Sequence, residues 1–196
     1  QRSRREKSEI PVVALVGYTN AGKSAMMNAL LRKTEKEEKS VMEKNMLFAT
    51  LDVSQRKIRL DTNREFILVD TVGFVSRLPH SLVEAFKGTL EEVLYADLLV
   101  EVVDASSEDC EFNMSVTETV LREIGAGDIP HIVAFNKMDL VESEDKLPIV
   151  PQKTFYVSAK EDSGIDELIE AVGSVIYADL RTPDLLIPYA EGQISS

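Results

Sequence analysis

The chain has 196 residues, of which 44% are hydrophobic and 29% are charged, and its formal net charge is −12. These values predict one globular domain with a sizeable core rather than a disordered chain. A domain this acidic is repelled by phosphate backbones, so we expect little direct nucleic-acid binding from it. The sequence has no apolar run of membrane-spanning length, and its single cysteine excludes an internal disulfide, which fits a cytoplasmic protein.

A small basic cluster opens the chain, formed by Arg2, Arg4, Arg5 and Lys7. We interpret residues 1–10 as a basic linker, with an RNA contact by this run as the alternative. Residues 11–180 are expected to form the domain, and residues 181–196 a linker or the start of a further element. The polar start and the short apolar finish indicate a fragment of a longer protein.

The most informative segment follows a first apolar run at 12–16. Residues 17–24 read Gly-Tyr-Thr-Asn-Ala-Gly-Lys-Ser, a G-x-x-x-x-G-K-[ST] phosphate-binding loop between a strand pattern and a helix pattern. Backbone N–H groups and the helix N-terminus would then face phosphate oxygens. We expect Lys23 to reach the β- and γ-phosphates and the Ser24 hydroxyl to bind Mg²⁺. The predicted nucleotide-binding residues of this segment are Gly17, Tyr18, Thr19, Asn20, Ala21, Gly22, Lys23, Ser24 and Ala25.

A predicted hairpin over residues 52–70, with its turn at 61–63, ends in Asp-Thr-Val-Gly at 70–73. We expect Asp70 to hold a magnesium-bound water and the Gly73 N–H to bond a γ-phosphate oxygen. This segment would then sense whether the γ-phosphate is present. The alternative is a simple turn at the end of a strand.

The second half of the chain alternates between strand and helix patterns. We expect strands at 98–103, 132–135 and 154–157, and helices near 114–124 and 165–176. Ser163 and Asp166 are spaced as a capping box at the start of the last helix. The alternation predicts an α/β fold, a doubly wound and mostly parallel sheet flanked by helices.

The strand at 132–135 ends in Asn136-Lys137-Met138-Asp139. A carboxylate at this place can accept two hydrogen bonds, from N1–H and the exocyclic amine of guanine, which adenine cannot offer. We therefore predict that Asp139 reads the base. Asn136 would tie the segment back to the phosphate loop, and the aliphatic stem of Lys137 would lie across the base.

The strand at 154–157 is followed by Ser158-Ala159-Lys160. We expect these three residues to border the base and the backbone amide of Ala159 to bond the guanine carbonyl. Taken alone, this tripeptide carries almost no information.

In this order and spacing the four segments resemble the G motifs of the translation-factor-related P-loop GTPases. Further segments resemble the HflX family more closely, namely Leu-Phe-Ala-Thr-Leu-Asp at 47–52, Leu-Pro-His-Ser-Leu-Val-Glu-Ala-Phe at 78–86 and Thr-Leu-Glu-Glu at 89–92. HflX proteins are ribosome-associated GTPases. The resemblance implies the G-domain fold, Mg²⁺-dependent hydrolysis of GTP to GDP, and a partner on the ribosome or its large subunit.

The resemblance also assigns roles to residues that the motifs alone leave open. Thr50 would be the switch threonine that closes over Mg²⁺ and the γ-phosphate, with Thr62 as a nearby alternative. Lys23, Thr50 and Gly73 are then the expected catalytic residues, and Ser24, Thr50 and Asp70 the expected magnesium ligands.

Phe74 stands where small regulatory GTPases place a glutamine that orients the attacking water. A phenyl ring can neither donate nor accept a hydrogen bond, so we expect slow intrinsic hydrolysis, accelerated by a partner or a cation. Asn20 resembles the loop asparagine of potassium-stimulated GTPases and would hold K⁺ beside the phosphates. The alternative is that its side chain bonds the backbone of its own loop.

Two other functions stay open at this point. A P-loop ATPase or small-molecule kinase shares the loop at 17–24 but has no use for Asp139. A nucleotide-dependent binding module would use both motifs with negligible turnover.

Overall fold

The computed structural model describes six segments of the chain, residues 10–35, 54–61, 63–71, 73–74, 93–143 and 147–178. Its strands are β1 (Val12–Val16), β2 (Ser54–Arg59), β3 (Glu65–Asp70), β4 (Leu98–Asp104), β5 (His131–Asn136) and β6 (Lys153–Tyr156). Its α-helices are α1 (Lys23–Glu35), α4 (Cys110–Glu123) and α5 (Ile165–Ile176), and a 3₁₀ helix, η1, spans Met138–Leu140.

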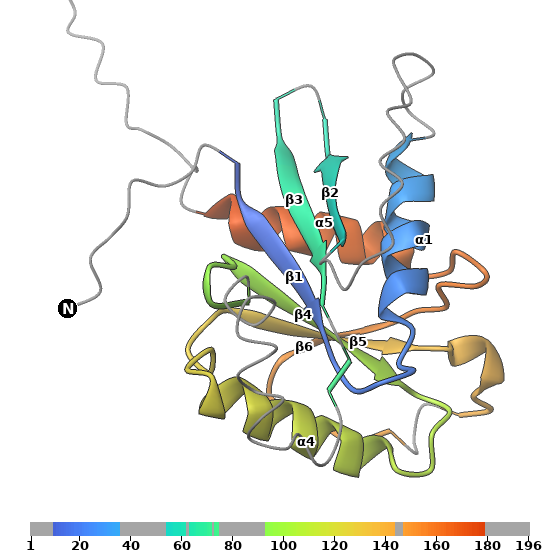
Figure 1. Cartoon of the computed structure of the whole chain (residues 1–196). Helices are drawn as coiled ribbons and strands as arrows, with labels where there is room; N and C mark the ends of the chain where they lie inside the picture. Colours follow the sequence, from blue (N-terminus) through green and yellow to red (C-terminus); the bar gives the residue numbers. More distant parts are fainter. Residues whose placement is uncertain are drawn as a thin grey trace, which may run out of the picture.

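The six strands form one sheet in the order β2-β3-β1-β4-β5-β6 (Figure 1). Only the β2–β3 pairing is antiparallel; the other four are parallel. The strand order changes direction at β1, which lies between β3 and β4. In open parallel sheets the ligand binds at the carboxyl ends of the strands beside such a switch point. The predicted doubly wound, mostly parallel α/β fold is confirmed.

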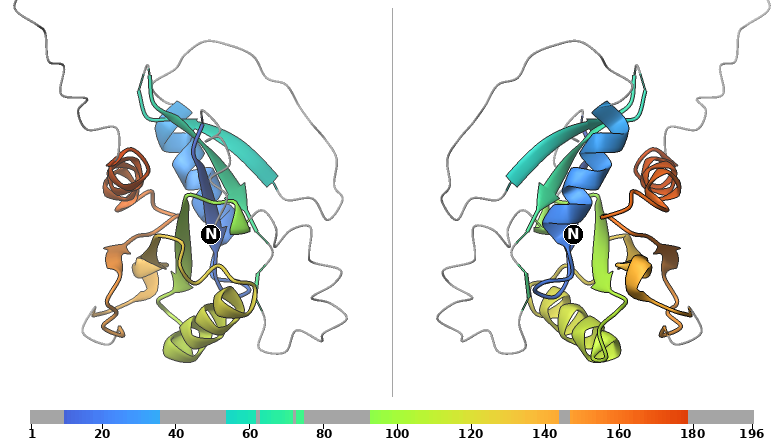
Figure 2. Two further views of the ribbon diagram at one scale, coloured as in Figure 1. Left: turned by 90° about the vertical axis from the view of Figure 1, so that its left-hand side faces the viewer. Right: turned by 90° about the vertical axis from the view of Figure 1, so that its right-hand side faces the viewer.

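Helices cover both faces of the sheet. α1 and α5 lie together on one face and α4 lies on the other (Figures 1 and 2). Alternate residues of β1 serve the two faces, because Val13 and Leu15 pack with α1 and α5 while Ala14 and Val16 pack with α4. Residues 13–16 are completely buried, which stabilises the fold by about 1.5–3 kcal/mol for each large aliphatic side chain.

The start of α5 differs from the predicted capping box. Its N-cap is Gly164, at φ 71°, with no side-chain cap. Ser163 instead exchanges two backbone hydrogen bonds with Ser158, at 3.0 and 3.2 Å, and Asp166 accepts a 2.6 Å bond from Lys33 Nζ. The capping-box prediction was wrong because the N-cap is Gly164, so that Ser163 lies one residue before it, and because Asp166 is bound by Lys33.

α4 begins at Cys110, four residues before the predicted start at 114. Cys110 is buried against Val103 and Phe135, and burial raises the pKa of its thiol to about 11. The early start is therefore a packing effect, since this residue joins the core between β4 and β5.

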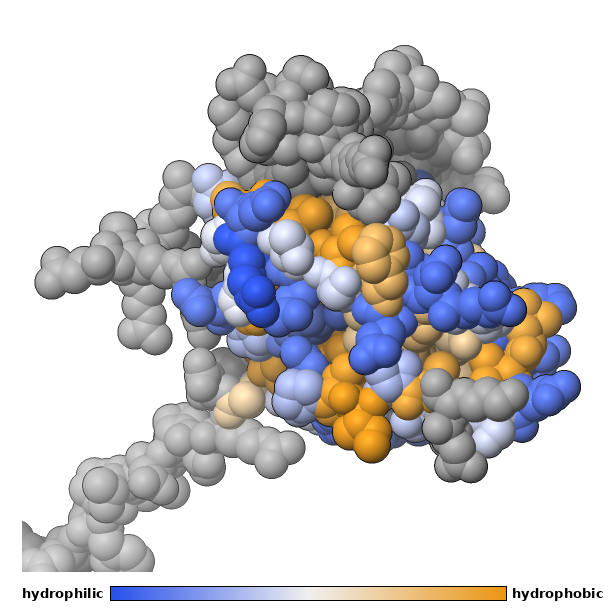
Figure 3. Space-filling model, turned by 90° about the horizontal axis from the view of Figure 1, so that it is seen from below, coloured by the Kyte–Doolittle hydropathy of each residue, from blue (hydrophilic) through white to orange (hydrophobic). Residues whose placement is uncertain are grey.

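Hydrophobic patches lie between hydrophilic residues on the surface seen from the α4 side (Figure 3). The exposed large hydrophobic side chains of the described residues are Leu94, Tyr95, Phe112, Leu140, Ile149 and Tyr156. Scattered apolar groups of this kind are ordinary on a globular domain. None of the described helices is both long and apolar enough to cross a membrane. The predicted terminal linkers lie outside the described residues, except for Ile10.

Candidate nucleotide-binding site

The candidate site lies at the carboxyl ends of β1 and β3, where a cavity of about 500 Å³ opens beside the start of α1. Its lining residues are Thr19, Asn20, Gly22, Lys23, Ser24, Ala25, Thr71 and Gly73. All of them belong to the predicted phosphate loop, to the residue after it or to the predicted γ-phosphate segment at 70–73. The fold thus brings two distant motifs to one cavity.

The phosphate loop joins β1 to α1 through residues with left-handed backbone. Asn20 has φ 60° and Gly22 has φ 95°, values that asparagine tolerates and glycine adopts freely. A Cβ on Gly22 would lie only 2.4 Å from Asn136 Nδ2. The absence of a side chain at Gly22 therefore permits the contact between the phosphate loop and the guanine motif.

Lys23 begins α1 and is 7% exposed. Its ammonium donates hydrogen bonds to the carbonyl oxygens of Gly17 and Tyr18, each at 3.1 Å. Burial lowers the pKa of Lys23, and the negative charge of Asp70 acts in the opposite direction. Because the acceptors used here are neutral carbonyls, an anionic phosphate would be the stronger partner for this cation.

Gly73 packs directly against the phosphate loop. A Cβ added to it would lie 2.8 Å from Thr19 Cα and 3.1 Å from Lys23 Nζ. The next residue, Phe74, donates its N–H to Gly17 O at 3.1 Å and accepts one from Thr19 N at 2.8 Å. Its ring is 1% exposed, so it belongs to the core and presents nothing to an attacking water.

Ser24 and Asp70 meet beside Lys23. The Ser24 hydroxyl donates to Asp70 Oδ2 at 2.6 Å, while Asp70 Oδ1 is buried and has no hydrogen-bond partner in the described segments. A hydroxyl and an orphaned carboxylate oxygen are the hard donors that Mg²⁺ prefers, so these two residues fit that ion. Elsewhere in the described ranges, no group of three or more His, Cys, Asp or Glu side chains is arranged to hold a metal.

Asn20 lines the same cavity as Lys23 and Ser24. Its side chain is exposed and makes no hydrogen bond to another described residue. The structure thus offers no support for the alternative in which this side chain bonds the backbone of its own loop.

Asn136, at the end of β5, connects the guanine motif to the phosphate loop. It is 2% exposed; its Nδ2 donates to Ala21 O at 3.0 Å, and its Oδ1 accepts from the Ala159 amide at 3.0 Å. The predicted tie from Asn136 to the phosphate loop is present. An amide with one donor and one acceptor engaged is held in a single orientation.

Asp139 follows in η1, and its side chain is 6% exposed. Its carboxylate accepts 2.7 Å and 3.4 Å hydrogen bonds from Ser158 Oγ and Lys160 Nζ, respectively. The Ser158 bond, assisted by Lys160, lowers the pKa of Asp139. The group is therefore a fixed, ionised acceptor at neutral pH, as a reader of guanine requires.

Two residues of the guanine motifs have protein partners that the sequence did not predict. The Ala159 amide, expected to face the guanine carbonyl, is bonded to Asn136 Oδ1 in this structure. The Lys137 ammonium lies 2.5 Å from Asp104 Oδ2 at the end of β4, which anchors the side chain whose stem was expected to cover the base. Asp104 carries no motif, and so the sequence did not single it out.

The remaining switch predictions fall outside the described residues. Thr50 and its alternative Thr62 lie there, as do Val72 and the segments at 78–86 and 89–92. Their proposed roles stay predictions.

Residues 12–137 match the family model described as a 50S ribosome-binding GTPase. The chain belongs to this family. The match includes the phosphate loop, Asp70, Gly73 and the start of the guanine motif.

Curated relatives narrow the position within this GTPase family. GTPase HflX of Caldanaerobacter subterraneus is 48% identical over 189 residues, which cover 96% of this chain and 42% of the relative. GTPase HflX of Akkermansia muciniphila is 42% identical over 201 residues, covering 99% of this chain and 45% of the relative. The HflX resemblance is confirmed, and the chain spans less than half the length of these relatives.

Solved structures of GTP-binding proteins share the fold. A GTP-binding protein from the hyperthermophilic archaeon Sulfolobus solfataricus, solved in complex with GDP, has a TM-score of 0.63 and 28% identity. The alignment covers 86% of this chain and 53% of that one.

Proposed function

We propose that this chain binds GTP and GDP and hydrolyses GTP to GDP and phosphate, acting as a nucleotide switch. The observation that carries the proposal is the bond from Asn136 Nδ2 to Ala21 O, 3.0 Å long. It joins the phosphate loop to the segment that presents Asp139, so one ligand with both triphosphate and guanine would contact both. In a P-loop ATPase or kinase, the adenine base would not offer Asp139 the two donors that guanine has, N1–H and the exocyclic amine.

The phosphate end supplies the groups for hydrolysis. Lys23 would hold the β- and γ-phosphates, Ser24, Thr50 and Asp70 would hold Mg²⁺, and the Gly73 amide would bond the γ-phosphate. The metal would neutralise charge on the phosphates while the γ-phosphoryl group of GTP is transferred to water. Phosphoryl transfer of this kind depends on positioning and on electrostatic stabilisation.

Water positioning has to come from a group other than Phe74, whose ring is in the core. We propose that K⁺ held partly by Asn20 supplies positive charge near the phosphates, the role of an arginine finger in other GTPases. The exposed Asn20 side chain in the Lys23 cavity supports this assignment. Because Phe74 cannot orient the water, we expect slow hydrolysis of GTP when no partner is bound.

The proposed partner is the ribosome, through its large subunit, in the cytoplasm. The family description and the HflX names of the relatives support this partner. The net charge of −12 argues against extensive direct RNA binding by the domain itself.

Two measurements separate this function from its alternatives. Tighter equilibrium binding of GDP than of ADP is expected, and equal affinities would favour an ATPase or kinase. Phosphate release from GTP should then be followed with and without purified large ribosomal subunits. Release that stays negligible in both conditions would favour a binding module without turnover.

A further inference from the structure

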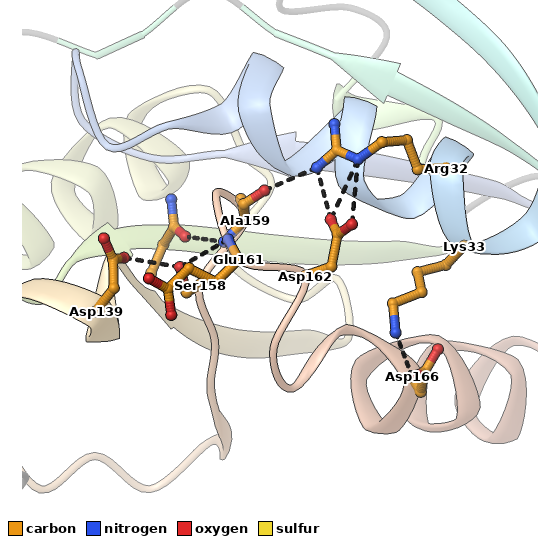
Figure 4. A network of polar contacts seen from close by, with 9 residues as sticks. Arg32, Lys33, Asp139, Ser158, Ala159, Glu161, Asp162 and Asp166 are labelled. Atoms are coloured by element: carbon orange, nitrogen blue, oxygen red, sulfur yellow. Dashed lines mark hydrogen bonds and ion pairs between the residues drawn. The ribbon is translucent and has the colours of Figure 1, made fainter.

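A polar cluster connects α1 to the loop that follows β6 (Figure 4), and two of its members, Arg32 and Asp162, belong to none of the predicted motifs. Arg32, in the last turns of α1, donates from Nη2 to the Ala159 carbonyl at 2.9 Å. The same nitrogen lies 2.6 Å from Asp162 Oδ1, and Nε lies 3.2 and 3.3 Å from the two Asp162 oxygens. One edge of the guanidinium thus binds a carboxylate and a backbone carbonyl together.

The loop that Arg32 holds has an unusual backbone. Asp162 has φ 56° and Gly164 has φ 71°, both in the left-handed region. Ser158 and Ser163 close the base of the loop through a pair of backbone hydrogen bonds at 3.0 and 3.2 Å. Arg32 therefore connects α1 to both arms of the loop, at Ala159 and Asp162, next to the pair of bonds that closes its base.

That loop carries the groups that orient the base readers. Ser158 Oγ bonds Asp139 at 2.7 Å, and the Glu161 amide donates to the same Ser158 oxygen at 3.2 Å. Ala159 is held from two sides, because its N–H binds Asn136 and its carbonyl binds Arg32. A shift of the loop would therefore move Ser158 and Ala159, the partners of Asp139 and Asn136.

These contacts form a closed ring with the phosphate loop. α1 runs from Lys23 to Arg32, Arg32 binds Ala159, Ala159 binds Asn136, and Asn136 returns to Ala21. An isolated surface ion pair contributes little, and Arg32 is 46% exposed on its side chain. Its importance lies in joining the phosphate-loop helix to the base-recognition loop.

We propose that Arg32 is a positioning residue for guanine recognition, which holds the loop at 158–162 so that Ser158 and Ala159 orient Asp139 and Asn136. The inference rests on the proposed function, since it concerns the same nucleotide site. Arg32 itself would not touch the nucleotide. Its loss would loosen the geometry of Asp139 while leaving Lys23 and Ser24 in place.

The test compares GDP with IDP, whose base lacks the exocyclic amine and so offers Asp139 one hydrogen bond fewer. The ratio of the two dissociation constants reports the geometry of Asp139, since the phosphate contacts are identical. Arg32→Met should lower the IDP-to-GDP ratio by about three- to tenfold, the size of effect typical of residues that couple through contacts. A general loss of structure would weaken the binding of both nucleotides equally and leave the ratio unchanged.

Lys33→Met is the matched control. Lys33 is the neighbouring residue of α1 and makes an ion pair of equal length, 2.6 Å, but with Asp166 of α5 rather than with the loop. The IDP-to-GDP ratio of the Lys33→Met variant should equal that of the parent protein. Should Arg32→Met fail to fold, Asp162→Asn provides the second test, because asparagine tolerates the left-handed backbone and the charge of the pair is removed.

The outcomes separate the two proposals. A parent that binds IDP as tightly as GDP would overturn the guanine assignment itself, and this inference with it. A parent that prefers GDP, with the same ratio in Arg32→Met and Asp162→Asn, would overturn only the role of Arg32. A lowered ratio in either Arg32→Met or Asp162→Asn, with Lys33→Met unchanged, supports it.

Discussion

The guanine end and the phosphate end of the candidate site hold their polar groups in different ways. At the guanine end, Asn136 is engaged through both its oxygen and its nitrogen, and Asp139 accepts two hydrogen bonds. At the phosphate end, Lys23 bonds to carbonyls of its own loop, and Asp70 Oδ1 is buried without a partner in the described residues.

The difference indicates which parts of the site are arranged before the ligand arrives. The base readers are held by protein contacts, so little reorganisation is needed when guanine binds. The phosphate groups instead have weak or missing partners that phosphate and Mg²⁺ would supply. Nucleotide binding should therefore change the phosphate end more than the guanine end.

The largest expected effect tests the phosphate end. Lys23→Ala should weaken both GDP and GTP on the order of 100-fold or more, because a phosphate buried without its cation costs several kcal/mol. Binding of a fluorescent guanine nucleotide measures this. Lys33→Ala, which removes a partly exposed lysine of the same helix, should leave affinity unchanged. Unaltered binding in Lys23→Ala would end the phosphate-loop assignment.

The next effect tests the guanine end. Asp139→Asn turns one acceptor oxygen into a donor group, which conflicts with the guanine edge and matches the second carbonyl of xanthine. Affinity for GDP should fall on the order of 30-fold while affinity for XDP rises. Competition between the two nucleotides gives the ratio. If the variant kept the preference of the parent for GDP, Asp139 would not be the base reader.

The smallest effect concerns the cation. If Asn20 helps to hold K⁺, hydrolysis should be about tenfold faster in potassium chloride than in sodium chloride at equal ionic strength. Asn20→Ala should remove that difference and leave GDP binding nearly intact. Phosphate release in the two salts decides the matter. Identical rates for the parent would discard the cation and leave a group supplied by the partner.

Local pattern was sufficient to predict elements whose apolar spacing is strict. The strands β3, β4, β5 and β6 fall within one residue of their expected bounds, because each is a short run of apolar, aromatic or β-branched residues that suits a pleated strand. The bounds of α5 match the expected 165–176, but its predicted capping box was wrong, since the N-cap is Gly164 and Asp166 is engaged by Lys33. The side chains that cap a helix depend on the tertiary fold as well as on local spacing.

The chemistry of both ends can be derived from the sequence, because Gly22, Lys23 and Ser24 and then Asn136 and Asp139 stand at spacings that few other functions require. Most of the contacts that join the two ends could be found only in the folded chain. The Asn136–Ala21 bond was expected, but Arg32, Asp104 and the double hold on Ala159 were not. These contacts link residues more than 20 positions apart and follow no periodic pattern. They form because the sheet order places the carboxyl ends of β1, β4, β5 and β6 side by side, and because α1 and α5 cover the same face of this sheet (Figure 1).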